Sequence, residues 1–330
     1  KLDEIRAVSD RVTVIRRGKS IETVEIAGAT NADLAEMMVG RSVSFKTAKE
    51  ASHPKEVVLS IKDLVVNENR GVPAVKNLSL DVRAGEIVGI AGIDGNGQSE
   101  LIQAITGLRK IESGSVELKG QSIVGLHPRQ ITEMSVGHVP EDRKAQGLIL
   151  DAPVLENLGL ATLRSTSRYG LADLAGQRTR STAVSEKLRI RMASIDQPIR
   201  DLSGGNQQKA VFGRWVLAGS KVLLLDEPTR GVDVGAKVEI YNIINEVTAQ
   251  GGAVLMVSSE LPEILGMSDR VVVMSGGRIA GEMDAADATQ DSIMQLAVAQ
   301  VEDHLTAAAT AHAKKAARTE KAAHSGAKRR

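Results

Sequence analysis

The sequence predicts an α/β domain built on a parallel β-sheet. The short apolar stretch EIVGIAGI, at 86–93, runs into a glycine-rich loop and then into QSELIQAITGL, at 98–108, which has helical spacing. The stretch VLLLDEP, at 222–228, is continuously apolar up to its acids, as expected of a central strand buried on both faces. Strands that alternate with helices along the chain favour the α/β class.

Four more segments extend this prediction. EVVLSIKDLVV, at 56–66, and NLSLDVRAG, at 77–85, are rich in β-branched and apolar residues and predict strands. AVLMVSSE, at 253–260, predicts another buried strand. DRVVVMSGGRIAGEM, at 269–283, predicts a hairpin.

Composition limits the possible functions. The chain has 330 residues, of which 42% are hydrophobic, and this suits one large domain or two smaller ones. A net charge of +1 does not favour binding to nucleic acid or to a membrane surface. The absence of cysteine excludes disulfides and thiolate metal sites and suits a reducing cytoplasm. No apolar run reaches the roughly 18 residues that a membrane-spanning helix needs.

An internal repeat links the two ends of the chain. EIRAVSDRVTVIRRGK, at 4–19, aligns without a gap with EILGMSDRVVVMSGGR, at 263–278, so each position recurs 259 residues later. We interpret residues 1–40 as the tail of a first domain and residues 56–300 as a complete second copy. The rest of the first copy would lie upstream of Lys1. A coincidental strand motif is the alternative.

Two segments differ in composition from these copies. Residues 41–55 are polar, contain a proline and predict a linker. Residues 301–330 are rich in alanine and basic residues without apolar periodicity, and they predict a frayed helix or a disordered tail. This tail could contact acidic lipid or RNA, although a solvated tail is the simpler interpretation.

The stretch GIAGIDGNGQSEL, at 89–101, departs from the phosphate-loop pattern at one position. That pattern requires Gly, four residues, Gly, Lys and then Ser or Thr, and Gly92, Gly97 and Ser99 match it. Gln98 occupies the lysine position, and a neutral amide cannot neutralise phosphate charge. Because charge-assisted hydrogen bonds are about twice as strong as neutral ones, losing one should cost roughly a few kcal/mol of transition-state stabilisation. The loop therefore predicts a weak or slow site.

Two further motifs follow in order, LSGGNQQK at 202–209 and LLLDEPTRGVD at 223–233. Alone, a glycine-rich loop can be a turn, the second motif a helix cap and the third a strand end. Together, their order and spacing resemble the nucleotide-binding cassette of the ATP-binding cassette (ABC) superfamily, over residues 1–40 and 55–300. The resemblance implies a P-loop NTPase of the ABC ATPase type, with a parallel core sheet, an antiparallel β subdomain and a helical signature subdomain.

The resemblance implies ATP and Mg²⁺ as cofactors. Glu227 would polarise the attacking water and Ser259 lies where the family contacts the γ-phosphate, so both are assigned catalytic roles. Ser99 and Asp226 would hold Mg²⁺. Backbone N–H groups of the loop would wrap the phosphates at the positive end of the following helix. The implied nucleotide-binding residues are Gly92, Asp94, Gly95, Asn96, Gly97, Gln98, Ser99, Glu100, Arg70 and Glu141.

The second motif resembles the signature sequence of the family. There it donates to the γ-phosphate of the nucleotide on the partner cassette, across a dimer interface. We therefore hypothesise that the signature motif completes the ATP site of the first cassette. Gln98 would then indicate that the ATP site of the second cassette contributes less to catalysis. Gly231 and Asp233 lie where the family has an interface-crossing loop. The signature residues are Leu202, Ser203, Gly204, Gly205, Asn206 and Gln207.

Three more positions depart from the family pattern. Ser259 stands where a histidine is usual. Glu141 stands where glutamine is common, and Arg143 or Lys144 could pair its charge. No aromatic residue is available for the adenine, which leaves Arg70 to stack on it.

Two fused cassettes with these motifs resemble the ATPase subunit of bacterial importers for monosaccharides or nucleosides. GIAGIDGNGQSEL, VGHVPEDR and GLILDAPVLENL are similar to the nucleoside branch, and the sugar members tend to carry Arg at the position of Gln98. The implied partners are the first cassette, two transmembrane permease subunits and, indirectly, an extracytoplasmic substrate-binding protein, without nucleic acid. The implied location is the cytoplasmic face of the bacterial membrane, where residues 141–160 would dock the permeases or simply form a surface loop and helix.

Two alternatives stay open. One is a non-hydrolysing regulatory cassette, although Glu227 is retained. The other is a soluble ABC protein that acts on nucleic acid or the ribosome, although the charge is balanced and the chain lacks a long charged insert. His53, His127 and His138 show no metal-ligand spacing and are expected at the surface or in loops.

Overall fold

The computed structural model describes residues 5, 7–16, 18–30, 33–34, 37, 54–167, 169 and 171–298. The chain divides into two compact units. The first comprises Lys1–Val58, Val82–Ile87 and Arg129–Met256, and the second comprises Leu59–Asp81, Val88–Pro128 and Val257–Arg330. Nearly all of the predicted linker, 41–55, and all of the predicted tail, 301–330, lie outside the described residues.

The first unit contains buried strands of the predicted kind. β8 (Val136–Val139) pairs in parallel with β9 (Val222–Asp226), and β10 (Ala253–Val257) lies on the other side of β9. Every residue of β9 and β10 is buried, because apolar side chains point to both faces of these strands. The helices of this unit include η1 (Ile26–Gly28), α4 (Pro128–Glu133), η2 (Arg143–Gly147), α5 (Val154–Gly159), α6 (Leu163–Thr166), α7 (Leu174–Lys187), η3 (Ile199–Asp201), α8 (Gly204–Leu217) and α9 (Val234–Ala249).

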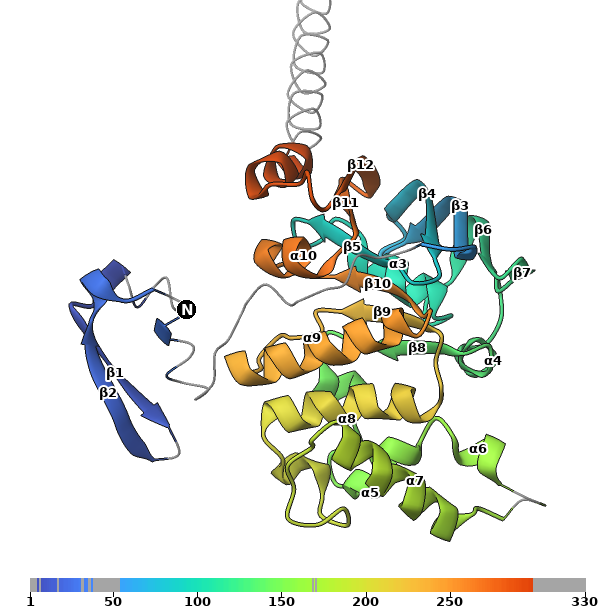
Figure 1. Ribbon diagram of the computed structural model, residues 1–330. Helices are drawn as coiled ribbons and strands as arrows, with labels where there is room; N and C mark the ends of the chain where they lie inside the picture. Colours follow the sequence, from blue (N-terminus) through green and yellow to red (C-terminus); the bar gives the residue numbers. More distant parts are fainter. Residues whose placement is uncertain are drawn as a thin grey trace, which may run out of the picture. The chain divides into compact units, whose positions relative to one another are not determined.

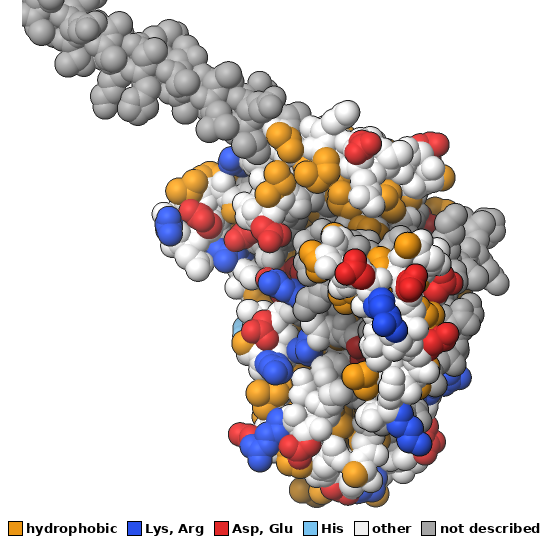
Figure 2. Space-filling view, turned by 90° about the vertical axis from the view of Figure 1, so that its left-hand side faces the viewer, with side chains coloured by type: hydrophobic (Ala, Val, Ile, Leu, Met, Phe, Trp, Pro, Cys, Tyr) orange, Lys and Arg blue, Asp and Glu red, His pale blue; other side chains and the backbone are white. Residues whose placement is uncertain are grey.

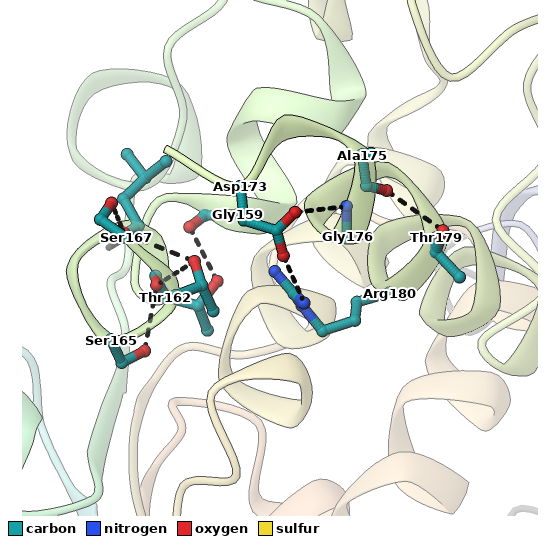
Figure 3. A network of polar contacts seen from close by, with 11 residues as sticks. Gly159, Thr162, Ser165, Ser167, Asp173, Ala175, Gly176, Thr179 and Arg180 are labelled. Carbon is teal, nitrogen blue, oxygen red and sulfur yellow. Dashed lines mark hydrogen bonds and ion pairs between the residues drawn. The ribbon is translucent and has the colours of Figure 1, made fainter. Parts of the chain in front are cut away.

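Helices α5, α7 and α8 pack on one another and form the predicted helical subdomain (Figure 1). α8 also contacts β8, η2 and α9, so it joins this helical group to the strands. The carboxylate of Asp173 begins α7 by accepting a hydrogen bond of 2.9 Å from the N–H of Gly176, and it pairs with Arg180 at 3.2 Å (Figure 3). Local caps of this kind satisfy N–H groups that a helix start leaves unpaired.

The second unit contains parallel strands and a separate antiparallel sheet. β5 (Ile87–Gly92) pairs in parallel with β11 (Arg270–Ser275), which pairs antiparallel with β12 (Arg278–Asp284). The other sheet has the strand order β4 (Pro73–Arg83), β3 (Val57–Asn67), β6 (Ile111–Leu118) and β7 (Gln121–Ser122). In it, β6 pairs antiparallel with both β3 and β7, as predicted for the β subdomain. The described part of this unit also contains the helices α3 (Gln98–Ile105) and α10 (Leu261–Met267), and residues 290–298 are helical.

The repeated sequence forms the same local structure twice. β1 (Arg11–Arg16) and β2 (Lys19–Glu25) make an antiparallel hairpin, as β11 and β12 do. The register shifts after Val14 in the first hairpin and after Val273 in the second, which are equivalent positions 259 residues apart. The two register shifts thus fall at the same place in the repeated sequence, and the assignment of residues 1–40 to a first domain stays a prediction.

Among the described helices, none combines the length and apolarity needed to cross a bilayer. On the face shown in Figure 2, Lys and Arg side chains are interspersed with Asp and Glu side chains. A strongly basic stripe, the usual footprint of nucleic-acid binding, is not visible on this face.

Candidate nucleotide site

The phosphate loop lies between β5 and α3, which is the strand–loop–helix order that the motif requires. Ile93, Asp94 and Gly95 are exposed at its tip. Gly95 and Gly97 have φ angles of 87° and 97°, in the left-handed region that favours glycine. Gly97 is also the N-cap of α3 and offers no side chain to the first N–H groups of the helix. These groups suit an anion.

Gln98 folds into its own loop. The residue is 7% exposed, and its Nε2 donates a hydrogen bond of 3.1 Å to the carbonyl oxygen of Ile93. A Cβ added to Gly92 would lie 2.5 Å from that nitrogen, so the amide also packs against the start of the loop. The amide therefore satisfies the loop backbone and contributes no positive charge.

Asn96 ties the loop to the turn between β11 and β12. Its Oδ1 accepts a hydrogen bond of 3.0 Å from the N–H of Gly276, and its Nδ2 donates to a carbonyl of β11 at 3.4 Å. Gly97 and Gly277 lie so close to the carbonyl oxygen of Ala74 that added Cβ atoms would come within 2.4 and 2.3 Å of it. The conformation of the loop is thus set by contacts within the protein.

The other predicted residues of the second unit take varied positions. Ser99 and Glu100 lie in the first turn of α3 and are half-buried. Arg70 is exposed in the turn between β3 and β4, so its stacking on adenine stays a prediction. Ser259 is exposed two residues after the end of β10 and stays a predicted γ-phosphate contact.

Two acids follow each other at the end of β9 in the first unit. Asp226 is the last residue of the strand and is 5% exposed. Glu227 is half-buried and has a φ angle of 48°. A left-handed conformation costs a non-glycine residue on the order of 1–3 kcal/mol and persists only where the surroundings enforce it. The N–H of Arg230 donates to the carbonyl oxygen of Glu227 at 3.1 Å, so the following loop takes part in holding this conformation.

Glu141 pairs with Arg230. The prediction that Arg143 or Lys144 pairs its charge is therefore wrong. Arg143 instead donates to two successive carbonyl oxygens, from Nη1 to Arg230 at 2.8 Å and from Nη2 to Gly231 at 3.3 Å. The planar fork of a guanidinium suits two neighbouring acceptors, and this leaves Glu141 to the side chain of Arg230.

The signature residues surround the N-terminus of α8. Ser203 is its N-cap and is exposed, and its hydroxyl makes no capping hydrogen bond but accepts one of 3.0 Å from Asn206 Nδ2. Gly204 is half-buried. Leu202 and Gln207 are buried, and Gln207 donates to a carbonyl of η3 at 3.2 Å, so both support the helix start from inside. The exposed hydroxyl and the first N–H groups suit an anion.

Gly231 and Asp233 lie between β9 and α9. The carboxylate of Asp233 accepts a hydrogen bond of 3.0 Å from the N–H of Ala236 and thereby begins α9. Gly231 has a φ angle of 68°. Gly205 packs on the same helix, because an added Cβ would lie 2.5 Å from the Cβ of Ala236. The structure gives Asp233 a capping role, and its place in an interface-crossing loop stays a prediction.

His138 departs from its expected surface position. It lies in β8, where its carbonyl oxygen accepts a hydrogen bond of 2.7 Å from Trp215 Nε1. Burial lowers the pKa of the imidazole to about 4, so the side chain is neutral at pH 7. A lone histidine in a short strand gives no sequence signal of burial, because β8 is buried by residues distant in the chain.

Two polar residues that are not predicted site residues lie inside the first unit. Arg214 of α8 donates to the carbonyl oxygens of Asn157 at 2.9 Å and Gly147 at 2.7 Å, and burial lowers its pKa to about 10. Asn157 is fully buried, accepts from the N–H of Ile149 at 2.9 Å and donates back to its carbonyl at 2.9 Å. The only sequence signal is an arginine within the apolar stretch of a helix.

Comparison with known proteins gives consistent relatives. A family model described as ABC transporter matches residues 75–230. The ribose import ATP-binding protein RbsA of Corynebacterium glutamicum is 57% identical over 311 residues, which are 94% of this chain and 58% of that protein. The nucleoside import ATP-binding protein NupA of Lactococcus lactis subsp. cremoris is 52% identical over 295 residues, which are 89% of this chain and 58% of that protein. The chain thus spans little more than half the length of these relatives.

Solved structures share the fold. MJ1267, an ATP-binding cassette of an ABC transporter, matches with a TM-score of 0.63 at 22% identity, covering 73% of this chain and 99% of that chain. The dimeric structure of MJ0796, a bacterial ABC transporter cassette, matches with a TM-score of 0.61 at 22% identity, covering 69% of this chain and 98% of that chain. At this identity the likeness concerns the fold alone, and it confirms the predicted fold class.

Proposed function

Since the chain carries an ABC transporter ATPase domain, we propose that it is the ATP-hydrolysing subunit of a bacterial importer for nucleosides or simple sugars. The relatives named for ribose import and for nucleoside import have similar identities, so the nucleoside branch stays a prediction. The subunit would work at the cytoplasmic face of the membrane. Its partners would be the first cassette, two permease subunits and, indirectly, a substrate-binding protein.

The residues of each unit fit ATP and Mg²⁺. The loop before α3 presents backbone N–H groups and a helix N-terminus, which suit phosphates. Ser99 supplies a hydroxyl directly after that loop, and Asp226 supplies a carboxylate at a strand end. Bound Mg²⁺ would neutralise charge on the phosphates. Glu227 would accept a proton from the attacking water.

The main support for this proposal is a difference between the phosphate loop and the N-terminus of α8. At the phosphate loop, the lysine position holds a buried amide that is bonded to Ile93. At the start of α8, the hydroxyl of Ser203 is exposed and uncommitted to capping. We therefore propose that the signature completes the ATP site of the first cassette in trans, while the site of this chain is weak or slow.

The test is the ATPase activity of the complete two-cassette importer with its permeases. Ser203→Ala and the harsher Gly204→Asp should lower turnover on the order of a hundredfold, because donors to developing phosphate charge are lost. Glu227→Gln should leave most turnover, because the first site would carry it. Ser165→Ala, an exposed hydroxyl on α6, serves as a matched control. Full turnover in the signature variants, or equal loss in Glu227→Gln, would contradict the asymmetric assignment.

The same position of Gln98 also favours a second candidate, a non-hydrolysing regulatory cassette. In that case Glu227→Gln would leave turnover entirely unchanged, and nucleotide bound at this site would persist through many cycles. Quantifying retained nucleotide after turnover separates the two candidates. A slow site exchanges ADP for ATP, whereas a regulatory site keeps its ATP.

A further inference from the structure

Arg143 connects three parts of the first unit. Its Nη1 and Nη2 donate to the carbonyl oxygens of Arg230 and Gly231 at 2.8 and 3.3 Å. A Cβ added to Gly204 would lie 2.7 Å from Nη2 and 3.1 Å from the carbonyl oxygen of Gly231. The guanidinium, the loop after β9 and the first residue of α8 are therefore in direct contact. Arg143 itself begins η2.

The guanidinium of Arg143 is partly withdrawn from solvent. Its Nε is inaccessible to solvent and has no hydrogen-bond partner in the described part of the protein. The neighbouring carboxylate of Asp142 accepts from the N–H groups of Lys144 and Ala145, so it caps η2. The ion pair between Glu141 and Arg230 adds a second link from the same segment to the same loop.

The loop so held is the one that carries Glu227. The backbone of Glu227 is left-handed, and its carbonyl oxygen accepts from the N–H of Arg230, which is the residue that Arg143 binds. Two residues of the loop are tied further. Thr229 is 1% exposed, and the carbonyl oxygen of Pro228 accepts a hydrogen bond of 2.8 Å from Gln208 of α8. A shift of this loop would therefore alter the setting of the Glu227 carboxylate.

We propose that Arg143 is a positioning residue that clamps the loop after Glu227 onto the N-terminus of α8. The carboxylate of Glu227 and the signature residues then move together with the segment that starts at Glu141. Arg143 acts through backbone contacts and needs no contact with nucleotide. The effect on turnover rests on the proposed function, whereas the clamp is a property of the fold.

The experiment compares Arg143→Met, which keeps an unbranched though shorter side chain and removes the donors, with Arg143→Lys in the full-length protein and its complex. Hydrogen exchange should accelerate together in peptides covering 226–233 and 203–208 in Arg143→Met. The kcat for ATP hydrolysis should fall about tenfold while KM changes less than about twofold, because binding groups are retained. Arg143→Lys should recover part of both effects. Arg178→Met, which breaks an exposed ion pair with Asp196, should change neither.

Each outcome decides between the two claims. Unchanged exchange in both peptides overturns the clamp, whatever the turnover. Faster exchange with unchanged kcat overturns the positioning role. A wild-type complex without ATPase activity overturns the proposed function, and the exchange data still decide the clamp. If Arg143→Met does not fold, Arg143→Lys must still show faster exchange in both peptides and a lower kcat, with smaller changes than those expected for Arg143→Met. Wild-type exchange and kcat in Arg143→Lys would then overturn the proposal.

Discussion

The side-chain amide of Gln98 donates a hydrogen bond to the carbonyl oxygen of Ile93, so the residue at the lysine position of the phosphate loop braces the loop itself. We expect Gln98→Lys to bind ATP about tenfold more tightly at this site, since an ammonium adds a charge-assisted hydrogen bond. Titration of the full-length protein with a fluorescent ATP analogue measures the affinity. Gln121→Lys, on the exposed strand β7, adds the same charge away from the loop and controls for net charge. If both variants gained the same affinity for ATP, net charge would explain the effect, and the proposed role of position 98 would be wrong.

Gly97 and Gly95 should respond differently to alanine although both have positive φ angles. A Cβ on Gly95 meets nothing within 4 Å, whereas one on Gly97 would lie 2.4 Å from the carbonyl oxygen of Ala74. Gly95→Ala should lower the free energy of unfolding by about 1 kcal/mol through backbone strain alone. Gly97→Ala should lower it by roughly 3 kcal/mol or more, because the backbone must also move. Urea unfolding measures both values, and equal losses would contradict the close approach.

His138 should make the stability depend on pH in mildly acidic solution. Burial lowers its pKa from 6.5 to about 4, so between these values the unfolded chain binds a proton that the folded chain does not. The free energy of unfolding should therefore be highest above pH 6.5 and fall by up to about 3 kcal/mol as the pH drops towards 4. Urea unfolding from pH 4.5 to 7.5 should show a reduced slope in His138→Gln. The exposed His127→Gln should keep the wild-type slope.

Asn157 and Asn245 should differ in their tolerance of leucine. Asn157 is fully buried and satisfies both the N–H and the carbonyl of Ile149. Asn157→Leu should therefore lower the free energy of unfolding by about 2–4 kcal/mol, because buried backbone groups lose their partners. The Oδ1 of Asn245 is buried without a hydrogen-bond partner among the described residues. Asn245→Leu should be neutral within about 1 kcal/mol, and thermal unfolding of the two variants checks the contrast.

The strands and the phosphate loop were predictable because their signals are local. A continuous apolar run predicts each of β9 and β10. The repeated sequence DRV followed by a glycine-containing turn predicts the hairpin of β11 and β12. β4 begins at Pro73, earlier than the predicted strand at 77, because a hydrogen bond of 2.8 Å from the N–H of Glu68 to Val72 closes the preceding turn early. Register and turn closure depend on paired backbone groups that composition does not encode.

The sequence by itself determined the order of the motifs, the missing lysine at Gln98 and the repeated hairpin, since each is a matter of residue type and spacing along the chain. The tertiary structure alone decided that Glu141 pairs with Arg230, 89 residues away, and that Arg143 holds the loop after Glu227 against α8. The physical reason is that the sequence motifs offer Glu141 three possible cationic partners, Arg143, Lys144 and Arg230. Only the packing of the loop decides that the side chain of Arg230 binds the carboxylate of Glu141, whereas the side chain of Arg143 binds backbone carbonyl oxygens.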